Sequence, residues 1–287
     1  MKTNLECIPC FVKQSLEAAK MATDDEEIQL KVMKAVMDHL QNISFTNSPP
    51  ELSREVHEII RNITKSKDPY RDVKNKSNEM AKKYYTKLKK ILEESEDPLL
   101  TSIKIAIIGN VIDFGTINRF NVDDMLKDLI KKKIDEKSYN DFKSTLKKSK
   151  TILYLADNNG EIFFDKLLIE EIAKLDKKIY FVVRKNPIIN DITIEDAKQV
   201  GIDKYADIIA ADKGQKISAP GIVLDFSSEE FIDLFKRSDM IISKGQGNYE
   251  GLSDVDRKVF FMLVVKCPLV AYDIDDEVGR LILKVKE

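Results

Sequence analysis

The chain has 287 residues, with 47 Lys and Arg against 49 Asp and Glu and a formal charge of −2. This length predicts one large domain or two ordinary ones, and the hydrophobic fraction of 43% is enough for a sizeable core. The near-neutral charge argues against bulk nucleic-acid binding. No apolar run approaches the roughly 18–20 residues that cross a bilayer, and the N-terminal segment does not resemble a signal peptide. Three cysteines do not make a disulfide framework, so we expect a cytoplasmic, globular protein with no membrane partner.

Apolar residues recur at helical spacing in the first part of the chain. They fall on one face of a 3.6-residue period, which is typical of amphipathic helices. Pro-containing turns separate several of these segments, because Pro disfavours helical geometry in the residue before it. The pattern predicts a compact helical array with helices over 8–19, 32–40, 52–63 and 80–92.

From about residue 150, short apolar runs alternate with amphipathic stretches such as 161–175 and 229–237. Near-continuous apolar strands separated by helices predict a parallel sheet that is covered on both faces. Ligands of such sheets bind beyond the C-terminal ends of the strands. Residues 99–149 are expected to be mostly helical and could belong to either part. The expected strands are 151–156, 179–184, 207–210, 222–226, 240–243 and 269–272.

A polar cluster, Asp157-Asn-Asn-Gly-Glu161, follows the first expected strand directly. An ordinary strand-to-helix loop explains one or two such residues, as a helix cap or a Gly with positive φ. Adjacent Asp and Asn side chains also supply the carboxylate and carbonyl oxygens that Mg²⁺ prefers. Both interpretations of the loop are open at this point.

Asp191 follows the next expected strand, 34 residues after Asp157 and about one βαβ unit away. Because consecutive parallel strands often lie side by side, the two loops are expected to meet at one edge of the sheet. Asp157, Asn158 and Asp191 would then form an open oxygen shell with room for water and a substrate phosphate. Asp191 could also cap the following helix, which does not exclude ligation.

Two further loops carry candidate residues. Lys244 ends another expected strand and begins the glycine-rich run KGQGNYEG, where an ammonium group and backbone N–H groups would bind an anion. The run has the spacing of neither a P-loop nor a dinucleotide motif. Asn110 and Asp113 lie in GNVIDFG after an apolar element, where a helix C-cap is an equally good explanation.

The cysteines and histidines offer little catalytic chemistry. Cys7 and Cys10 form a CxxC at the start of an amphipathic helix, with only Cys267 and two histidines available to complete a zinc site. A thioredoxin-like motif would follow a strand. We therefore expect one or both of the Cys7 and Cys10 thiols to pack as small apolar groups, and His39 and His57 to be solvated.

Together these motifs resemble the metal-dependent damage-control phosphatases, formerly domain of unknown function 89, which share their fold with the acidic-residue methyltransferase-like proteins. The CxxC and the short length are similar to the subfamily found in archaea. The resemblance spans most of the chain and is specific as a set. The segments that carry it are CIPCF (7–11), DPYRDVK (68–74), GNVIDFG (109–115), ADNNGEIFFD (156–165), NPIINDIT (186–193) and KGQGNYEGL (244–252).

The resemblance implies a helical array over residues 1–98 that packs on a Rossmann-like, three-layer α/β/α catalytic domain with a mainly parallel sheet over 99–287. It also implies a divalent metal ion, which is Mn²⁺, Co²⁺, Ni²⁺ or Mg²⁺ in this family. The residues that would hold the ion are Asp157, Asn158 and Asp191.

The implied reaction is hydrolysis of a small phosphomonoester, such as a sugar phosphate, in the removal of damaged or surplus metabolites. Asn110 and Lys244 would face the phosphate and act in catalysis with Asp157. Asp113, Glu161 and Asn248 would line the substrate site.

Several alternatives stay open in the sequence. Asp157 could be a nucleophile or only a metal ligand. A carboxyl methyltransferase that uses S-adenosylmethionine is a second function, although no motif for that cofactor is present. A third is a module that binds a phosphorylated metabolite without turnover while its helical half contacts a partner. The native metal, the physiological substrate and the oligomeric state are not determined.

Overall fold

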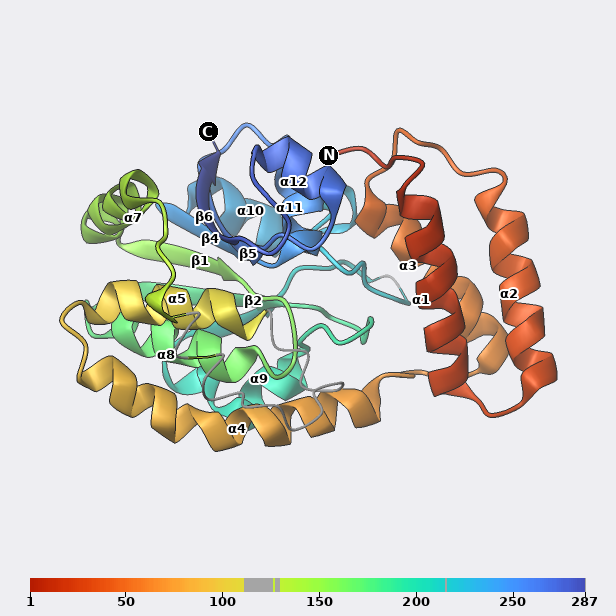
Figure 1. The fold of residues 1–287 in the computed structure, drawn as a ribbon, viewed down its shortest axis with the longest axis horizontal. Helices are drawn as coiled ribbons and strands as arrows, with labels where there is room; N and C mark the ends of the chain where they lie inside the picture. Colours follow the sequence, from red (N-terminus) through yellow and green to blue (C-terminus); the bar gives the residue numbers. More distant parts are fainter. Residues whose placement is uncertain (111–125, 127–129, 215, 287) are drawn as a thin grey trace.

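A computed structural model describes residues 1–110, 126, 130–214 and 216–286. A six-stranded, mainly parallel sheet lies between layers of helices, and three N-terminal helices pack beside these layers (Figure 1). The predicted three-layer α/β/α fold is therefore confirmed. In the described part of the chain, no helix is long and apolar enough to cross a membrane.

The strand order in the sheet is β3-β2-β1-β4-β5-β6. Strands β1 to β5 run parallel, and β6 is antiparallel to β5. The order reverses between β1 and β4, which is the position where open α/β sheets bind their ligands. The bounds are β1 Thr151–Leu155, β2 Lys178–Val183, β3 Asp207–Ala210, β4 Met240–Lys244, β5 Val259–Val264 and β6 Leu281–Lys286.

Two of the expected strands are wrong. The segment 222–226 holds only the short 3-10 helix η2 (Leu224–Phe226), and 269–272 lies within the helix α12 (Pro268–Ile274). Pro268 stands in the first turn of α12, where its missing N–H costs nothing, and it marks a helix start that the apolar run conceals. The strands β5 and β6 are not among the expected ones, because short apolar runs do not distinguish a buried strand from a buried helix.

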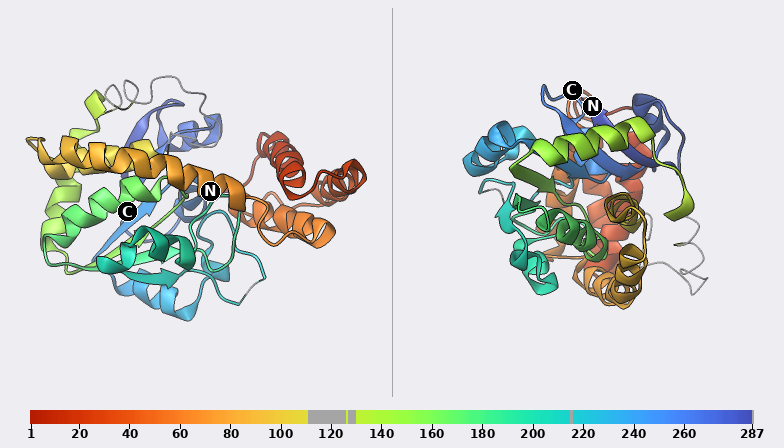
Figure 2. Two further views of the ribbon diagram at one scale, coloured as in Figure 1. Left: turned by 90° about the horizontal axis from the view of Figure 1, so that it is seen from below. Right: turned by 90° about the vertical axis from the view of Figure 1, so that its left-hand side faces the viewer.

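The first three helices form their own apolar cluster, which we call the N-terminal bundle. Its core contains Phe11 of α1, Val32 and Val36 of α2, and Val56 and Ile60 of α3. Figure 2 shows the bundle at one end of the molecule, beside the layers that enclose the sheet. The bounds of its helices are α1 Cys7–Ala22, α2 Glu26–Leu40 and α3 Pro49–Thr64.

The sheet is covered by two further apolar clusters, one on each face. The cluster on one face includes Leu88 of α4, Ile107 of α5, Phe142 of α7 and Phe164 of α8, and the other includes Phe231 of α10. Since α4 packs on the sheet layers, the helices expected over 1–98 do not all belong to the bundle, and a domain boundary at residue 98 stays a prediction. The bounds are α4 Arg71–Glu93, α5 Pro98–Gly109, α7 Glu136–Lys148, α8 Ile162–Ala173, α9 Ile194–Val200, α10 Glu229–Arg237 and α11 Gln246–Leu252.

The expectation that His57 is solvated is wrong. Its side chain is only 3% exposed, and it lies on the inner side of α3. Burial, assisted by the charge of Arg61, lowers the pKa of His57 to about 4. The apolar period of α3 places position 57 next to Val56 on the buried face, where the imidazole lies near Tyr70 and near the loop after β2 that contains Ile188.

We expect His57 to make the protein less stable as the pH falls. Between pH 6.5 and about 4 only the unfolded state takes up the proton, so stability is complete above this window and is lost through it. At about 1.4 kcal/mol per pKa unit the loss is about 3 kcal/mol. His57→Phe should reduce the difference between urea unfolding free energies at pH 7 and pH 4 by this amount. An unchanged difference in His57→Phe would contradict the assignment.

Candidate active site

Backbone hydrogen bonds join the loops that follow β1 and β2. Asn158 and Asp191 face each other in an isolated antiparallel bridge, and the Ile192 N–H donates to the Asp157 carbonyl at 2.9 Å. The two loops therefore meet at one edge of the sheet, as the spacing of the two aspartates predicts.

The two aspartates each have one carboxylate oxygen held by the protein. Asp157 Oδ2 accepts from Asn110 Nδ2 at 2.8 Å and from Asn158 Nδ2 at 2.6 Å, and Asp191 Oδ2 accepts from Arg184 Nε at 2.7 Å. Among the described residues, no hydrogen bond reaches the Oδ1 atom of either aspartate. Asp157, Asn158 and Asp191 line one cavity of about 350 Å³.

Negative charge is concentrated at this position. Burial, followed by the nearby carboxylates of Glu161 and Asp191, raises the pKa of Asp157 well above its usual range. Burial also raises the pKa of Asp191 to about 6, although Arg184 acts in the opposite direction. A bound cation would offset this repulsion, and carboxylate and amide oxygens are the ligands of hard divalent metals.

The residues present therefore fit a divalent metal ion, but only with an amide among the ligands. No three His, Cys, Asp or Glu side chains within the described ranges are arranged to hold an ion. Asn158 is thus needed beside the two aspartates. In addition, buried Asn110 Oδ1 has no hydrogen-bond partner in the described structure.

Gly245 makes room for the Asp157 carboxylate. Its φ is +79°, and a Cβ at this position would come within 1.8 Å of Asp157 Oδ2. Gly245, the residue after β4, thus allows the Asp157 carboxylate to approach the backbone closely. From the sequence, we expected the glycines of this loop to let an anionic ligand approach.

Lys244 is directed into the protein and is fully buried. Its ammonium group donates to the Ala106 carbonyl at 2.9 Å and to the carboxylates of Glu161 and Asp165. These three acceptors use all three N–H donors of a lysine. Lys244 does not line the cavity, and a contact with the substrate phosphate stays a prediction.

Glu161 and Asn110 connect this buried ion cluster to the candidate metal site. Asn110 Nδ2 donates to Glu161 Oε2 at 2.8 Å as well as to Asp157. Both residues are buried, and neither lines the cavity. Asp113 lies outside the described residues.

Asn248 holds loops together. It is fully buried, and its Oδ1 accepts from Arg184 Nη2 at 2.7 Å and from the Ile222 N–H at 2.9 Å. Its Nδ2 donates to the carbonyls of Ala156 and Lys244 at 3.1 and 2.8 Å. Because both donors and both lone pairs are used, the side chain has no group left for a substrate.

The structure places a different lysine, Lys266, in the cavity. Lys266, two residues after β5, is exposed, lines the cavity, and acts through its charge to lower the pKa of Asp157. The sequence did carry a signal for it, since a lysine at the end of a near-continuous apolar run is the same pattern that pointed to Lys244. The signal was missed because β5 was not recognised as a strand.

The N-terminal bundle supplies the opposite wall of the cavity. Cys7 and Cys10 of α1 line it near Cys267, which precedes α12, and near Glu250 of α11, whose pKa is raised to about 7 by burial. Cys7 packs against the bundle core and Cys267 against one of the sheet clusters, as expected for thiols that act as small apolar groups, whereas Cys10 is exposed. The sequence did not predict that all three thiols share one wall.

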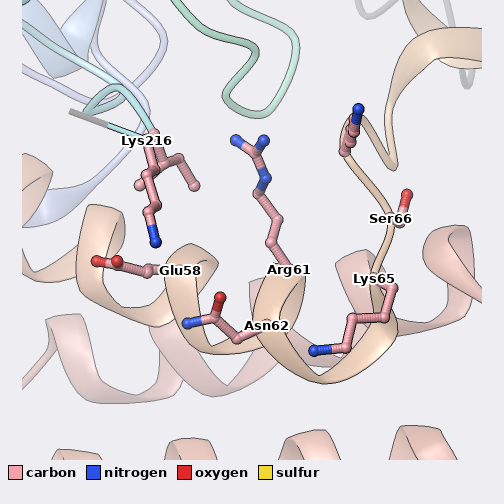
Figure 3. Close-up of a pocket in the computed structure, with 8 residues that line it drawn as sticks. Glu58, Arg61, Asn62, Lys65, Ser66 and Lys216 are labelled. Atoms are coloured by element: carbon pink, nitrogen blue, oxygen red, sulfur yellow. The ribbon is translucent and has the colours of Figure 1, made fainter. Parts of the chain in front are cut away.

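A second hollow, of about 200 Å³, lies at the C-terminal end of α3 (Figure 3). Arg61 and Asn62 of α3 and Lys65, the residue after this helix, line it, and Lys216 reaches it from the loop after β3. It contains none of the predicted site residues, and half of the residues that line it are cations.

Comparison with known proteins identifies the family. The model of the damage-control phosphatase ARMT1-like domain matches residues 3–282. The chain belongs to this family. It is 36% identical over 292 residues to a damage-control phosphatase of Archaeoglobus fulgidus, with complete coverage of both chains. It is 35% identical over 293 residues to a damage-control phosphatase of Pyrococcus horikoshii, with 98% of this chain and 97% of the relative covered.

A solved structure of the family confirms the fold. The crystal structure of a DUF89 family protein from Pyrococcus horikoshii is similar to the whole chain, with a TM-score of 0.89, 32% identity and complete coverage of both chains.

A further relative by sequence, an uncharacterized protein of Methanocaldococcus jannaschii, is 37% identical over 295 residues, which cover 99% of this chain and 95% of the relative.

The close approach of Gly245 and Asp157 gives a test by mutation. Gly245→Ala should destabilise the fold by about 2–4 kcal/mol, because it adds displacement of a buried carboxylate to the strain of positive φ. The control Gly279→Ala, with φ +88° and no atom within 4 Å, should cost only about 1 kcal/mol. In an Asp157→Ala background the excess cost of Gly245→Ala should shrink, as measured by urea unfolding. Equal costs in both backgrounds would contradict the contact.

Proposed function

We propose that the chain is a metal-dependent phosphatase that hydrolyses a small, sugar-phosphate-like phosphomonoester in metabolite damage control. The observation that carries the proposal is the pair of aspartates at the switch point of the sheet, whose Oδ1 atoms lack a donor in the described structure and which line the same cavity as Lys266. The activity named for the relatives supports it.

Asp157, Asn158 and Asp191 would hold the metal ion, which we propose to be Mn²⁺, Co²⁺, Ni²⁺ or Mg²⁺. When bound, such an ion supplies positive charge to a phosphate oxygen and lowers the pKa of a coordinated water. Asn110 and Asn158 occupy one oxygen of Asp157, so a single oxygen is left for the reaction site. We assign this oxygen to metal ligation rather than to nucleophilic attack.

Lys266 would bind the phosphate. Its exposed ammonium group is near Asp157 on the same cavity wall, so it can offset the charge of the transferring phosphoryl group. Lys244 and Asn110 would act on the site indirectly, since their polar groups hold Glu161 and Asp157 in place.

We also propose that the chain belongs to the CxxC-bearing subfamily that is found in archaea. Cys7 and Cys10 and the archaeal sources of the relatives support this placement. We propose further that its partner is a small phosphorylated metabolite and that it works in the cytoplasm.

Phosphate release tests the activity. The protein should hydrolyse p-nitrophenyl phosphate with Mn²⁺ or Co²⁺, and EDTA should stop the reaction. Asp157→Asn should lower kcat/KM by at least about 100-fold, because the metal site loses one of its two carboxylate charges. Asp207→Asn, at the opposite ends of the strands, is the matched control and should retain activity. Full metal-dependent activity in Asp157→Asn would contradict the proposed site. Tight S-adenosylmethionine binding by the wild-type protein, without phosphate release, would favour a methyltransferase.

The two lysines should separate catalysis from stability. Lys266→Met should lower kcat/KM by about 10–1,000-fold with little change in thermal stability, because its side chain is exposed. Lys244→Met should destabilise the fold by about 3–5 kcal/mol, because Glu161 and Asp165 lose their buried counter-charge. Steady-state kinetics and urea unfolding of both variants check this assignment. An active Lys266→Met enzyme together with a stable but inactive Lys244→Met enzyme would reverse the two roles.

A further inference from the structure

Arg184 follows β2 and lies between the candidate metal site and the helix α11. Its side chain is only 2% exposed. Nε donates to Asp191 Oδ2 and Nη2 donates to Asn248 Oδ1, each at 2.7 Å. The backbone N–H of Arg184 donates to the Ile192 carbonyl at 2.8 Å, which holds the chain on both sides of the loop. One guanidinium group thus links the loop after β2 to the helix α11.

The partner on the far side of the guanidinium group is itself fixed. Asn248 donates to the Ala156 and Lys244 carbonyls, at the ends of the adjacent strands β1 and β4. A planar guanidinium group bound at both Nε and Nη2 has little freedom to rotate. The position of Asp191 is therefore set from β1 and β4 as well as from its own loop.

This arrangement determines which carboxylate oxygen of Asp191 accepts a hydrogen bond from the protein. Arg184 occupies Oδ2, whereas no hydrogen bond from the described residues reaches Oδ1, and Asp191 lines the cavity. Arg184 also supplies the counter-charge that a buried carboxylate requires, at an N–O distance of 2.7 Å. Arg184 does not line the cavity, so it acts through Asp191.

We propose that Arg184 is a positioning residue for the metal site, which fixes the Asp191 carboxylate so that Oδ1 is presented to the ion. This inference rests on the proposed function. The proposed positioning requires an arginine at this position, because a lysine ammonium group is a point charge that cannot hold Asp191 and Asn248 in one plane. The hydrogen bond from Arg184 to Asn248 is part of this positioning, since it prevents the guanidinium group from moving with Asp191 toward the cavity.

The experiment compares Arg184→Lys and Arg184→Met with the wild type. Mn²⁺ affinity is measured by isothermal titration and by electron paramagnetic resonance of the metal-bound protein, and the stability of the metal-free protein is measured by urea unfolding. We expect Mn²⁺ affinity to fall about 10–100-fold in Arg184→Lys and further in Arg184→Met, as for other residues that orient metal ligands. In Arg184→Lys, saturating Mn²⁺ should restore much of kcat.

A matched control distinguishes positioning from general stability. Glu170 forms a partly buried ion pair with Lys89, at 2.8 Å, and does not line the cavity. Glu170→Gln should lower stability but leave Mn²⁺ affinity unchanged. If Arg184→Lys does not fold, Asn248→Ser replaces it as the test, because it removes the anchor but keeps the Arg184–Asp191 pair, and it should lower Mn²⁺ affinity about 10-fold.

The outcomes separate the two proposals. Normal Mn²⁺ affinity in the folded Arg184 variants, or in Asn248→Ser when it is the test, would overturn the role of Arg184 and leave the phosphatase proposal in place. A wild-type protein that binds neither Mn²⁺ nor Co²⁺ would overturn the metal site itself. A fall in affinity of equal size in Glu170→Gln would show that the effect is general destabilisation and would also overturn the inference.

Discussion

The site depends on two buried carboxylates of like charge that are held side by side at the end of a parallel sheet. Burial, followed by the carboxylates of Glu161 and Asp191, raises the pKa of Asp157, and burial is the main cause of the raised pKa of Asp191. The backbone bridge between Asn158 and Asp191 leaves the two loops no freedom to separate. The fold thus maintains a concentration of negative charge that a cation would stabilise.

Two buried polar side chains near this pair, those of Lys244 and Asn248, have their hydrogen-bonding capacity filled by the protein. Lys244 uses its three donors, and Asn248 uses two donors and two lone pairs. An unsatisfied polar group in such a position would be costly, so these networks fix the loops in one arrangement. Residues that first appear to be ligands for a substrate therefore serve to hold the residues that line the cavity.

The N-terminal bundle gives the sheet edge its opposite wall. Cys7, Cys10 and Gln14 of α1 and Ser53 of α3 line the cavity with the strand-end loops. A substrate bound at the aspartates would thus touch a helical surface that differs in chemistry from the charged end of the sheet.

Patterns along the chain predicted the N-terminal helices, the parallel sheet and the meeting of the loops that carry Asp157 and Asp191. Hydrophobic periodicity is a local property, and the carboxyl ends of neighbouring parallel strands meet at one edge. Three-dimensional packing was needed to show that Lys244 is turned inward, that Lys266 lies in the cavity, that Asn248 joins several elements, and that Cys267 lies near Cys7 and Cys10. The direction of a side chain at a strand end depends on which distant groups satisfy its hydrogen bonds, and a linear pattern does not contain those partners.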